Sequence, residues 1–287
     1  MASLLAPPNF PVIHLYIAAI IFSLTVAMLL EAALPLFAES KAPLLRWFRN
    51  LTLSALAVCT TLLVSALFWA SSRALGVTPG SGALAAMGLP IWAQWIATFI
   101  LLDTITYTLH RLSHAVPWLW RLHAIHHSDI ELDATTTHRH HPGESMVAAL
   151  VNLPLLLILA PPVWAVLAYS ITAVTVATFS HSSVALPDWL DKVLRRLIVT
   201  PAFHRVHHSA NQIQTDSNYA TVFSVLDFLF RSASPTVPDK GRSLTIGLET
   251  GRDPANQTLK AILLAPFRRK IALDPIGPST TRTNSAS

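Results

Sequence analysis

Long apolar runs with few or no charges fill the first hundred residues of the chain. They cover residues 12–36, 51–72 and 74–102. A helix needs about 20 apolar residues to cross the hydrocarbon core of a bilayer, and each run is long enough. Because Pro79 and the neighbouring glycines favour a loop at the start of the third run, the pattern predicts membrane-spanning helices at 12–36, 51–72 and about 84–105.

A further uncharged stretch at 145–187 is long enough for two helices. Pro161 and Pro162 divide it near the middle, and proline breaks a helix because it lacks the N–H donor and its ring clashes with the preceding turn. We therefore predict a helical hairpin with arms at about 145–160 and 163–181. Each arm is slightly short for a full crossing, so a partly inserted hairpin is an alternative.

The distribution of Lys and Arg predicts the orientation in the membrane. The loop at 38–50 holds three basic residues, whereas the loop at 73–83 holds one. Short loops rich in Lys and Arg face the cytoplasm, so the third span should end on the cytoplasmic side, where His110 follows it. The hairpin returns the chain to the side that it left, which brings His204 to the same face. In a bacterial protein this membrane is the inner membrane.

Composition supports the membrane assignment. Of the 287 residues, 52% are hydrophobic and 12% are charged, whereas soluble domains carry about 25% charged residues. We assign the net charge of +5 to anionic lipid and topology, not to nucleic acid. The single cysteine, Cys59, excludes a disulfide framework and a thiolate metal site. No basic residue precedes the first apolar run, so we predict no cleaved signal peptide.

The histidines carry the main functional signal, because 12 of the 13 lie between His110 and His208. They form HRLSH from His110, HAIHH from His123 and HRVHH from His204. Residues i, i+3 and i+4 share a helix face, so each motif can present several imidazoles to a metal. Eight imidazoles exceed the four ligands of a tetrahedral zinc, which favours two metals. The proposed ligands are His110, His114, His123, His126, His127, His204, His207 and His208.

Other polar residues could complete such a site. His181 ends the second arm of the hairpin on the same predicted side and is a further candidate ligand. His141 is a ligand or a hydrogen-bonding support. Asp103 either holds a ligand imidazole in its tautomer or is a charge at a helix end. His138 and His140 are predicted to be solvated.

With these residues in place, the chain resembles the fatty acid hydroxylase / sterol desaturase superfamily over roughly residues 30–232. Residues 101–144 contain D-x3-Y-x2-H-R-x2-H, L-W-x2-H-x2-H-H-S and R-x-H-P-x-E in order. FSHSSVALP, TPAFHRVHHS and TDSNYATVFSVLDFLF follow. The chain departs from the usual pattern at positions outside the proposed ligands, namely Ser183, Ala220, Leu226 and Arg231.

The resemblance implies a membrane enzyme of the bacterial type with a histidine-rich di-iron centre and O2 as co-substrate. It implies that the eight histidines and His181 bind two iron ions, that His141 supports the site, and that Arg139 and Glu144 form a structural pair behind it. The implied reaction is hydroxylation or desaturation of a fatty acyl or sterol-like lipid. A reductase, ferredoxin or cytochrome must supply the electrons, because the chain has no dinucleotide, haem or iron–sulfur motif.

Two alternatives belong to other classes. A zinc-dependent membrane hydrolase would share the histidines but would usually need three per catalytic metal. A metal transporter would place its polar ligands near the middle of the bilayer, whereas here the motifs follow the ends of the apolar runs. The order of apolar runs and motifs leads to the fold prediction: an all-α integral membrane helical bundle with a cytoplasm-facing helical cap that carries a histidine-rich dimetal site.

The predicted domain organisation has three parts. Residues 1–100 contain the N-terminal transmembrane helices, and residues 101–232 form the fatty acid hydroxylase-like catalytic region with the hairpin at about 145–181. Residues 233–287 form a polar cytoplasmic tail with a disordered end. Within it, residues 258–270 are either an amphipathic helix on anionic lipid or an ordinary surface helix.

Overall fold

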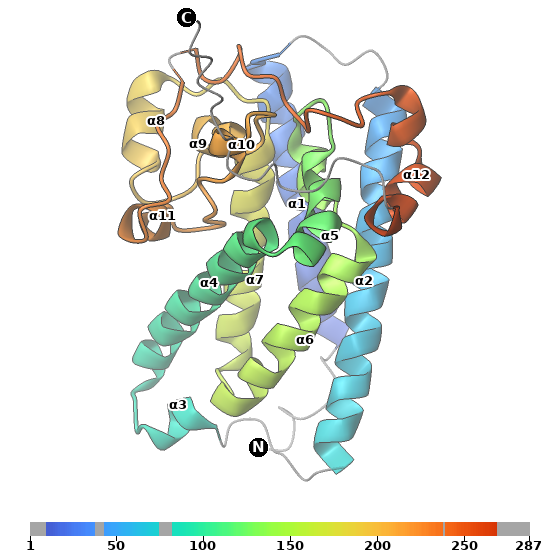
Figure 1. The fold of residues 1–287 in the computed structure, drawn as a ribbon. Helices are drawn as coiled ribbons and strands as arrows, with labels where there is room; N and C mark the ends of the chain where they lie inside the picture. The colour runs from blue at the N-terminus through green and yellow to red at the C-terminus, as the bar shows by residue number, and fades with distance from the viewer. Residues whose placement is uncertain (1–9, 38–42, 75–81, 238, 269–287) are drawn as a thin grey trace, which may run out of the picture.

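The computed structural model of the protein describes residues 10–37, 43–74, 82–237 and 239–268. Within these ranges every regular element is a helix, and β structure is limited to two isolated bridges. This confirms the all-α prediction. The long helices are α1 (Phe10–Ala33), α2 (Pro43–Ala74), α4 (Ile91–Ala115), α6 (Pro142–Leu159) and α7 (Val163–His181), as Figure 1 shows.

Short helices gather at one end of this bundle and form the cap (Figure 1). In the cap, α5 directly follows α4, and η2 lies between α5 and the hairpin. The remaining cap elements follow the hairpin in the sequence. The cap elements are α5 (Pro117–His127), η2 (Ala134–His138), α8 (Asp188–Leu194), α9 (Pro201–His207), α10 (Gln212–Thr215), α11 (Val225–Leu229), η3 (Pro254–Gln257), α12 (Leu259–Leu264) and η4 (Ala265–Phe267). One further short helix, α3 (Ala83–Ala86), lies at the opposite end.

Four helices of the described chain are long and apolar enough to cross a membrane: α1 from His14, α2 up to Phe68, α6 and α7. Apolar helices at 12–36 and 51–72 and the hairpin arms are thus confirmed, although α2 begins at Pro43, earlier than predicted. The run predicted at 84–105 forms α4 instead, which starts only after Pro90. Its 25 residues include a glutamine, an aspartate and four threonines, which reduce its apolar character below that of the other four.

The hairpin turn lies where the two prolines divide the apolar stretch. Helix α6 ends at Leu159, Ala160 adopts a left-handed backbone with φ of 41°, and α7 begins at Val163 directly after Pro162. Gly82 packs against this turn, because a Cβ atom there would lie 2.6 Å from the Cβ of Ala160. Only glycine permits so close an approach.

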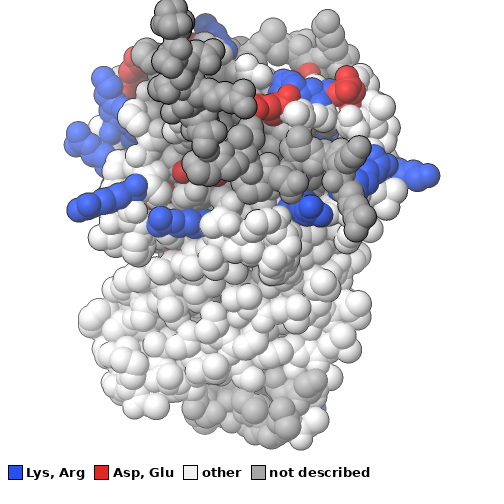
Figure 2. Space-filling view, in the orientation of Figure 1, with Lys and Arg blue, Asp and Glu red and all other residues white. Residues whose placement is uncertain are grey.

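The packing divides the long helices into two sets. Helix α2 packs along α6, α1 packs along α7, and α4 also contacts α7. Large apolar side chains such as Phe22, Leu63 and Ile158 face outward with 68%, 62% and 63% of their surface exposed. In Figure 2 the charged residues gather over the cap, and the surface of the helical bundle is almost free of them. An exposed apolar surface of this extent fits contact with lipid.

The cap is bound to α2 by a cluster of charges. Arg46, in the first turns of α2, forms ion pairs with Asp129, Glu131 and Asp133, and its Nη1 lies 3.0 Å from Asp129 Oδ2. Burial alone would raise the pKa of Asp129, but Arg46 and Arg139 more than offset it and the pKa lies below its usual value. The predicted loop at 38–50 is therefore partly helical, and Arg46 binds acidic partners within the protein.

The C-terminal segment packs on the cap. Ala261 and Ile262 of α12 are buried, and Ile262 packs against Leu53 of α2 and Ile125 of α5. Phe267 remains 73% exposed. The helix predicted at 258–270 thus forms as α12 and η4 and is bound to the protein on one side, while the predicted disordered end lies outside the described residues.

Candidate metal centre

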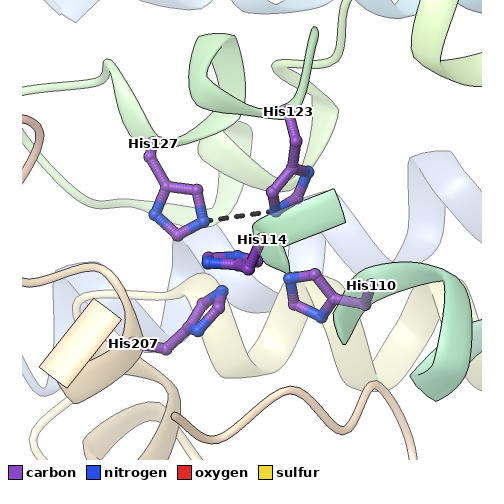
Figure 3. Close-up of side chains that lie close together, drawn as sticks. All are labelled: His110, His114, His123, His127 and His207. Carbon is purple, nitrogen blue, oxygen red and sulfur yellow. Dashed lines mark hydrogen bonds between the residues drawn. The ribbon is translucent and has the colours of Figure 1, made fainter. Parts of the chain in front are cut away.

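Five histidines form the first of two groups, which we call group one. His110 and His114 come from the end of α4, His123 and His127 from α5, and His207 from α9, and Figure 3 shows their rings converging. Each offers one nitrogen atom, and these atoms all lie within 4.8 Å of one another. The consecutive helices α4 and α5 and the distant helix α9 therefore contribute to one potential metal site.

Four histidines form group two: His126, His181, His204 and His208. The Nε2 atom of His181 lies 3.0 Å from that of His126 and 3.1 Å from that of His204, and His204 lies 3.2 Å from His208. Two imidazole nitrogens that bind one metal at about 2.1 Å lie about 3 Å apart when the angle at the metal is near 90°. The spacing in group two fits a shared ion.

The repeated HxxHH pattern divides between the two groups. In α5, the i and i+4 residues His123 and His127 belong to group one, and His126 belongs to group two. In the second repeat the roles are exchanged, because His204 and His208 belong to group two and His207 belongs to group one. Each repeat therefore contributes to both sites, and neither group is complete without residues of both.

Hydrogen bonds to the outer nitrogens orient several of these rings. In five histidines Nδ1 lies within hydrogen-bond distance of a protein oxygen, which directs Nε2 to the metal. The same arrangement is usual for metal-binding histidines. The pairs are His110 with the Tyr219 carbonyl (2.6 Å), His114 with Asp216 Oδ1 (3.1 Å), His123 with Glu144 Oε1 (2.7 Å), His181 with the Ala177 carbonyl (2.7 Å) and His207 with the Ser217 carbonyl (2.7 Å).

The inner nitrogens of group one also fit a metal. Within the described part of the chain, the Nε2 atoms of His110, His114 and His207 are buried and have no hydrogen-bond partner. A buried polar atom without a partner costs about 1–3 kcal/mol. A bound cation would satisfy all three, so the donor set suits a metal that prefers imidazole, such as iron, zinc or copper.

Burial favours the neutral form of five of these imidazoles. It lowers the pKa of His126, His127, His204 and His208 well below the usual value, and neighbouring imidazoles lower it further. The pKa of His207 falls to about 3, again mainly through burial. Only the neutral ring has a lone pair for a metal, and these rings have one at neutral pH.

Asp103 acts on the site indirectly. Its carboxylate accepts hydrogen bonds from the backbone N–H groups of Val222 and Phe223 at 3.3 and 3.1 Å and from Tyr169. It therefore holds the loop after α10. None of these hydrogen bonds joins Asp103 to a ligand imidazole. Asp227 holds the same loop by accepting from the N–H groups of Tyr219 and Ala220 at 2.8 and 2.9 Å.

Sequence reasoning missed Asp216 and Asp227. Asp216 accepts from His114, and Asp227 holds the residue whose carbonyl accepts from His110. Asp227 is fully buried in the apolar segment VLDFL. An isolated carboxylate in such a segment was the available signal, because a buried charge requires partners.

The predicted pair of Arg139 and Glu144 is wrong. Glu144 accepts from His123 at 2.7 Å and from His140 at 3.0 Å. Arg139 is 1% exposed and donates elsewhere, to the Ile125 carbonyl, Ser128 Oγ, Asn50 Oδ1 and Gln257 Oε1. The physical reason is that each buried side chain finds several partners of its own, so neither needs the other.

The prediction that His138 is solvated is wrong, and for His140, whose side chain is 34% exposed, it holds only in part. His138 is 7% exposed, and its Nδ1 lies 3.2 Å from Ser54 Oγ. His140 stacks on His126 with ring centroids 4.5 Å apart and contacts Glu144. His123, His140 and Glu144 form a third cluster of potential ligands. Because this cluster shares His123 with group one and is already hydrogen-bonded, we describe it as support for that group.

His141 caps helix α6. The N–H of Gly143 donates to His141 Nδ1 at 3.0 Å, and His141 Nε2 lies 3.2 Å from the Leu263 carbonyl. We expect His141→Ala to lower the free energy of unfolding by about 1 kcal/mol through loss of the cap. Asn is a good cap residue, so His141→Asn should lose less. Thermal unfolding in detergent checks this, and an unchanged metal content distinguishes a cap from a ligand.

A cavity of about 810 Å³ leads to the histidines. It lies between the α2–α6 pair and the α1–α7 pair, and its lining includes apolar side chains such as Ile17, Leu62 and Val166. On α7 the lining extends from Val163 to His181, which is about 27 Å at 1.5 Å per helical residue. This space, the membrane cavity, also touches His110, His123, His126 and His204.

Comparison with known proteins places this site in a family. Residues 95–232 match the fatty acid hydroxylase family, and the matched region contains all nine histidines of the two groups. This match identifies residues 95–232, just under half of the chain, as a fatty acid hydroxylase region. The family match begins within α4 and ends just after α11, so it covers the hairpin and most of the cap. No solved structure shows a significant match to this chain.

Two kinds of curated protein are similar to this chain. Alkylglycerol monooxygenase of Danio rerio is 30% identical over 144 residues, which cover 50% of this chain and 31% of that protein. Ornithine lipid hydroxylase OlsE of Rhizobium tropici is 32% identical over 192 residues, which cover 66% of this chain and 54% of that protein. The alignments therefore span about a third to about half of the length of these relatives.

Proposed function

We propose that this protein is an O2-dependent di-iron enzyme that hydroxylates a membrane lipid with a long alkyl or acyl chain. The observation that carries the proposal is the contact between the membrane cavity and the two histidine groups. A cavity of this size suits a ligand of lipid size. Its length along α7 is close to the thickness of the hydrocarbon core, about 30 Å, so a chain can enter from the bilayer.

Group one and group two would each hold one iron ion. Imidazole suits iron as well as zinc, but zinc has no redox chemistry. When bound, the two irons supply the electron transfer to O2 that converts C–H, O2, two electrons and two protons into C–OH and water. The names of the relatives, a monooxygenase and a lipid hydroxylase, favour this reaction over hydrolysis and over desaturation.

The residues of the chain have separate roles in this proposal. The outer hydrogen bonds of the histidines fix the direction of each ring, and the apolar lining holds the chain and excludes water. The two electrons come from a separate donor. We propose that the cap faces the cytoplasm, where reductases and ferredoxins are available, because Arg46 and Arg49, in the first turns of α2, lie at the cap end of the bundle and Lys41 shortly precedes this helix in the sequence.

The proposal is tested on full-length protein expressed with added iron and purified in detergent. Metal content is measured, and 18O2 is supplied with reduced ferredoxin and either 1-O-hexadecylglycerol or an ornithine lipid, the classes that the relatives' names suggest. The expected result is about two irons per chain and one 18O atom in the lipid product. Retained zinc with conversion of lipid in the absence of O2 would instead identify a zinc-dependent hydrolase.

The membrane cavity allows a test of substrate placement. Ala57 on α2 lines it, whereas Ala55 on the same helix is exposed and lies outside the lining. We expect Ala57→Phe to reduce turnover of a 16-carbon chain about tenfold or more while iron content stays the same, because the ring occupies part of the cavity. Ala55→Phe is the matched control. Equal turnover by both variants would show that the chain binds elsewhere.

A further inference from the structure

Outside the two histidine groups, one polar atom in the wall of the membrane cavity has no hydrogen-bond partner among the described residues. His138 is 7% exposed and lines the cavity together with Ser54, whose Oγ lies 3.2 Å from His138 Nδ1. The other ring nitrogen, Nε2, is buried and has no hydrogen-bond partner among the residues that the structure describes. Native proteins rarely leave such an atom unsatisfied. A bound molecule that reaches this part of the wall can supply the missing partner.

Three hydroxyls in the wall differ from His138 because their own helices satisfy them. The hydroxyl of Thr61 donates to the Ala57 carbonyl at 3.0 Å, that of Thr106 to the Leu102 carbonyl at 2.8 Å, and that of Ser170 to the Val166 carbonyl at 2.9 Å. All three residues line the membrane cavity. These hydroxyls present little unsatisfied polarity to a lipid chain, so outside the two histidine groups His138 offers the wall an unsatisfied polar atom.

His138 is also uncharged at neutral pH. Burial, and then the nearby His140, lowers the pKa of His138 to about 4. A neutral imidazole does not offer the positive charge that a carboxylate or phosphate would select. It offers one hydrogen bond, which suits an uncharged oxygen.

We propose that His138 Nε2 donates a hydrogen bond to an ester, amide or ether oxygen of the lipid in the membrane cavity. In this arrangement Ser54 donates to Nδ1, which leaves the imidazole proton on Nε2. This inference rests on the proposed function only in that a lipid occupies the cavity. It adds a selectivity: the site takes a chain with a neutral oxygen function in preference to a plain hydrocarbon or a free carboxylate.

The position of His138 implies where the polar end of the lipid lies. Two residues further along the chain, His140 lines the same cavity and stacks on His126 of group two. The oxygen function therefore lies at the metal end of the cavity, and the rest of the chain extends toward Val163. The carbon that reaches the metals is then close to the oxygen function, not near the far end of the chain.

The experiment measures binding and needs no turnover. Full-length protein in detergent is equilibrated with equal amounts of methyl palmitate and octadecane, and the bound lipids are extracted and quantified by mass spectrometry. The parent should retain the ester in preference to the alkane. We expect His138→Leu to reduce this ratio about tenfold, as for the loss of one buried hydrogen bond. His138→Gln keeps a side-chain donor and should recover most of the ratio.

Thr61→Val is the matched control, because it removes a hydroxyl that lines the same cavity but is already satisfied by its own helix. It should leave the ratio unchanged. The proposal is overturned if the parent binds both probes equally, if His138→Leu keeps the parent ratio, or if Thr61→Val reduces the ratio as much. A general loss of folding in His138→Leu would reduce binding of both probes, whereas the proposal requires loss of the ester alone. Iron content and 18O incorporation report separately on the proposed function.

Discussion

The double variant His127→Ala/His207→Ala is expected to retain about one iron per chain, whereas His126→Ala/His207→Ala should retain almost none. The first pair comes from different repeats but from the same group, so group two stays intact. The second pair removes one ligand from each group. Loss of a ligand should reduce turnover more than the 10–100-fold typical of outer hydrogen-bond partners. Metal analysis of purified protein measures the first effect, and 18O incorporation measures the second.

His14→Ala is the control for this series, because His14 is the one histidine outside the cluster between His110 and His208. It should keep two irons. If both double variants lose the same amount of metal, the division of the repeats between two groups is wrong. The two irons would then bind as a single cooperative unit or the histidines would pair differently.

Arg139→Leu is expected to lower the free energy of unfolding by about 3–5 kcal/mol, the range for removing one member of a buried charged network. The guanidinium of Arg139 joins the end of α5 to Asn50 on α2 and to Gln257 near the C-terminal end of the cap. Without it, Asn50 Oδ1 and Gln257 Oε1 lose this donor, and the Ile125 carbonyl keeps only its donors from Ser128. Thermal unfolding in detergent measures the effect.

Lys260→Ala is a suitable comparison for Arg139→Leu, because Lys260 on α12 is exposed and its loss should change stability by less than about 0.5 kcal/mol. A melting temperature of Arg139→Leu equal to that of Lys260→Ala would contradict the role of Arg139 in joining the cap to the membrane helices. Iron content of the folded fraction should stay near that of the parent, since Arg139 contacts none of the proposed ligands directly through its hydrogen bonds.

The membrane helices were predictable because their signal is local. An apolar run must form its own hydrogen bonds in lipid, so length and charge suffice to find α1, α6 and α7. The start of α2 was not predictable in this way, because Arg46 reads as a loop charge until its acidic partners near residue 130 are known. The shift of α4 follows from Pro90 and from polar residues that pack against the loop after α10.

The histidines were predictable as a set but not as two groups. The spacing i, i+3 and i+4 shows which side chains share a helix face, and it does not show which neighbouring helix faces them. That depends on how α9 lies against α5. Asp103 and Arg139 have partners more than a hundred residues away, such as Val222 and Gln257. The partners of Glu144, His140 and His123, are closer in the sequence, and the pattern does not show that the turn before α6 brings them together.

The unequal origin of the two groups has a consequence for biosynthesis. Four of the five nitrogens of group one come from residues 110–127, a segment that is complete before the hairpin is synthesised. Group two has only His126 at that stage and waits for the end of α7 and for α9. Because chains grow and fold from the N-terminus, we expect the two metals of the proposed site to bind in order, group one before group two.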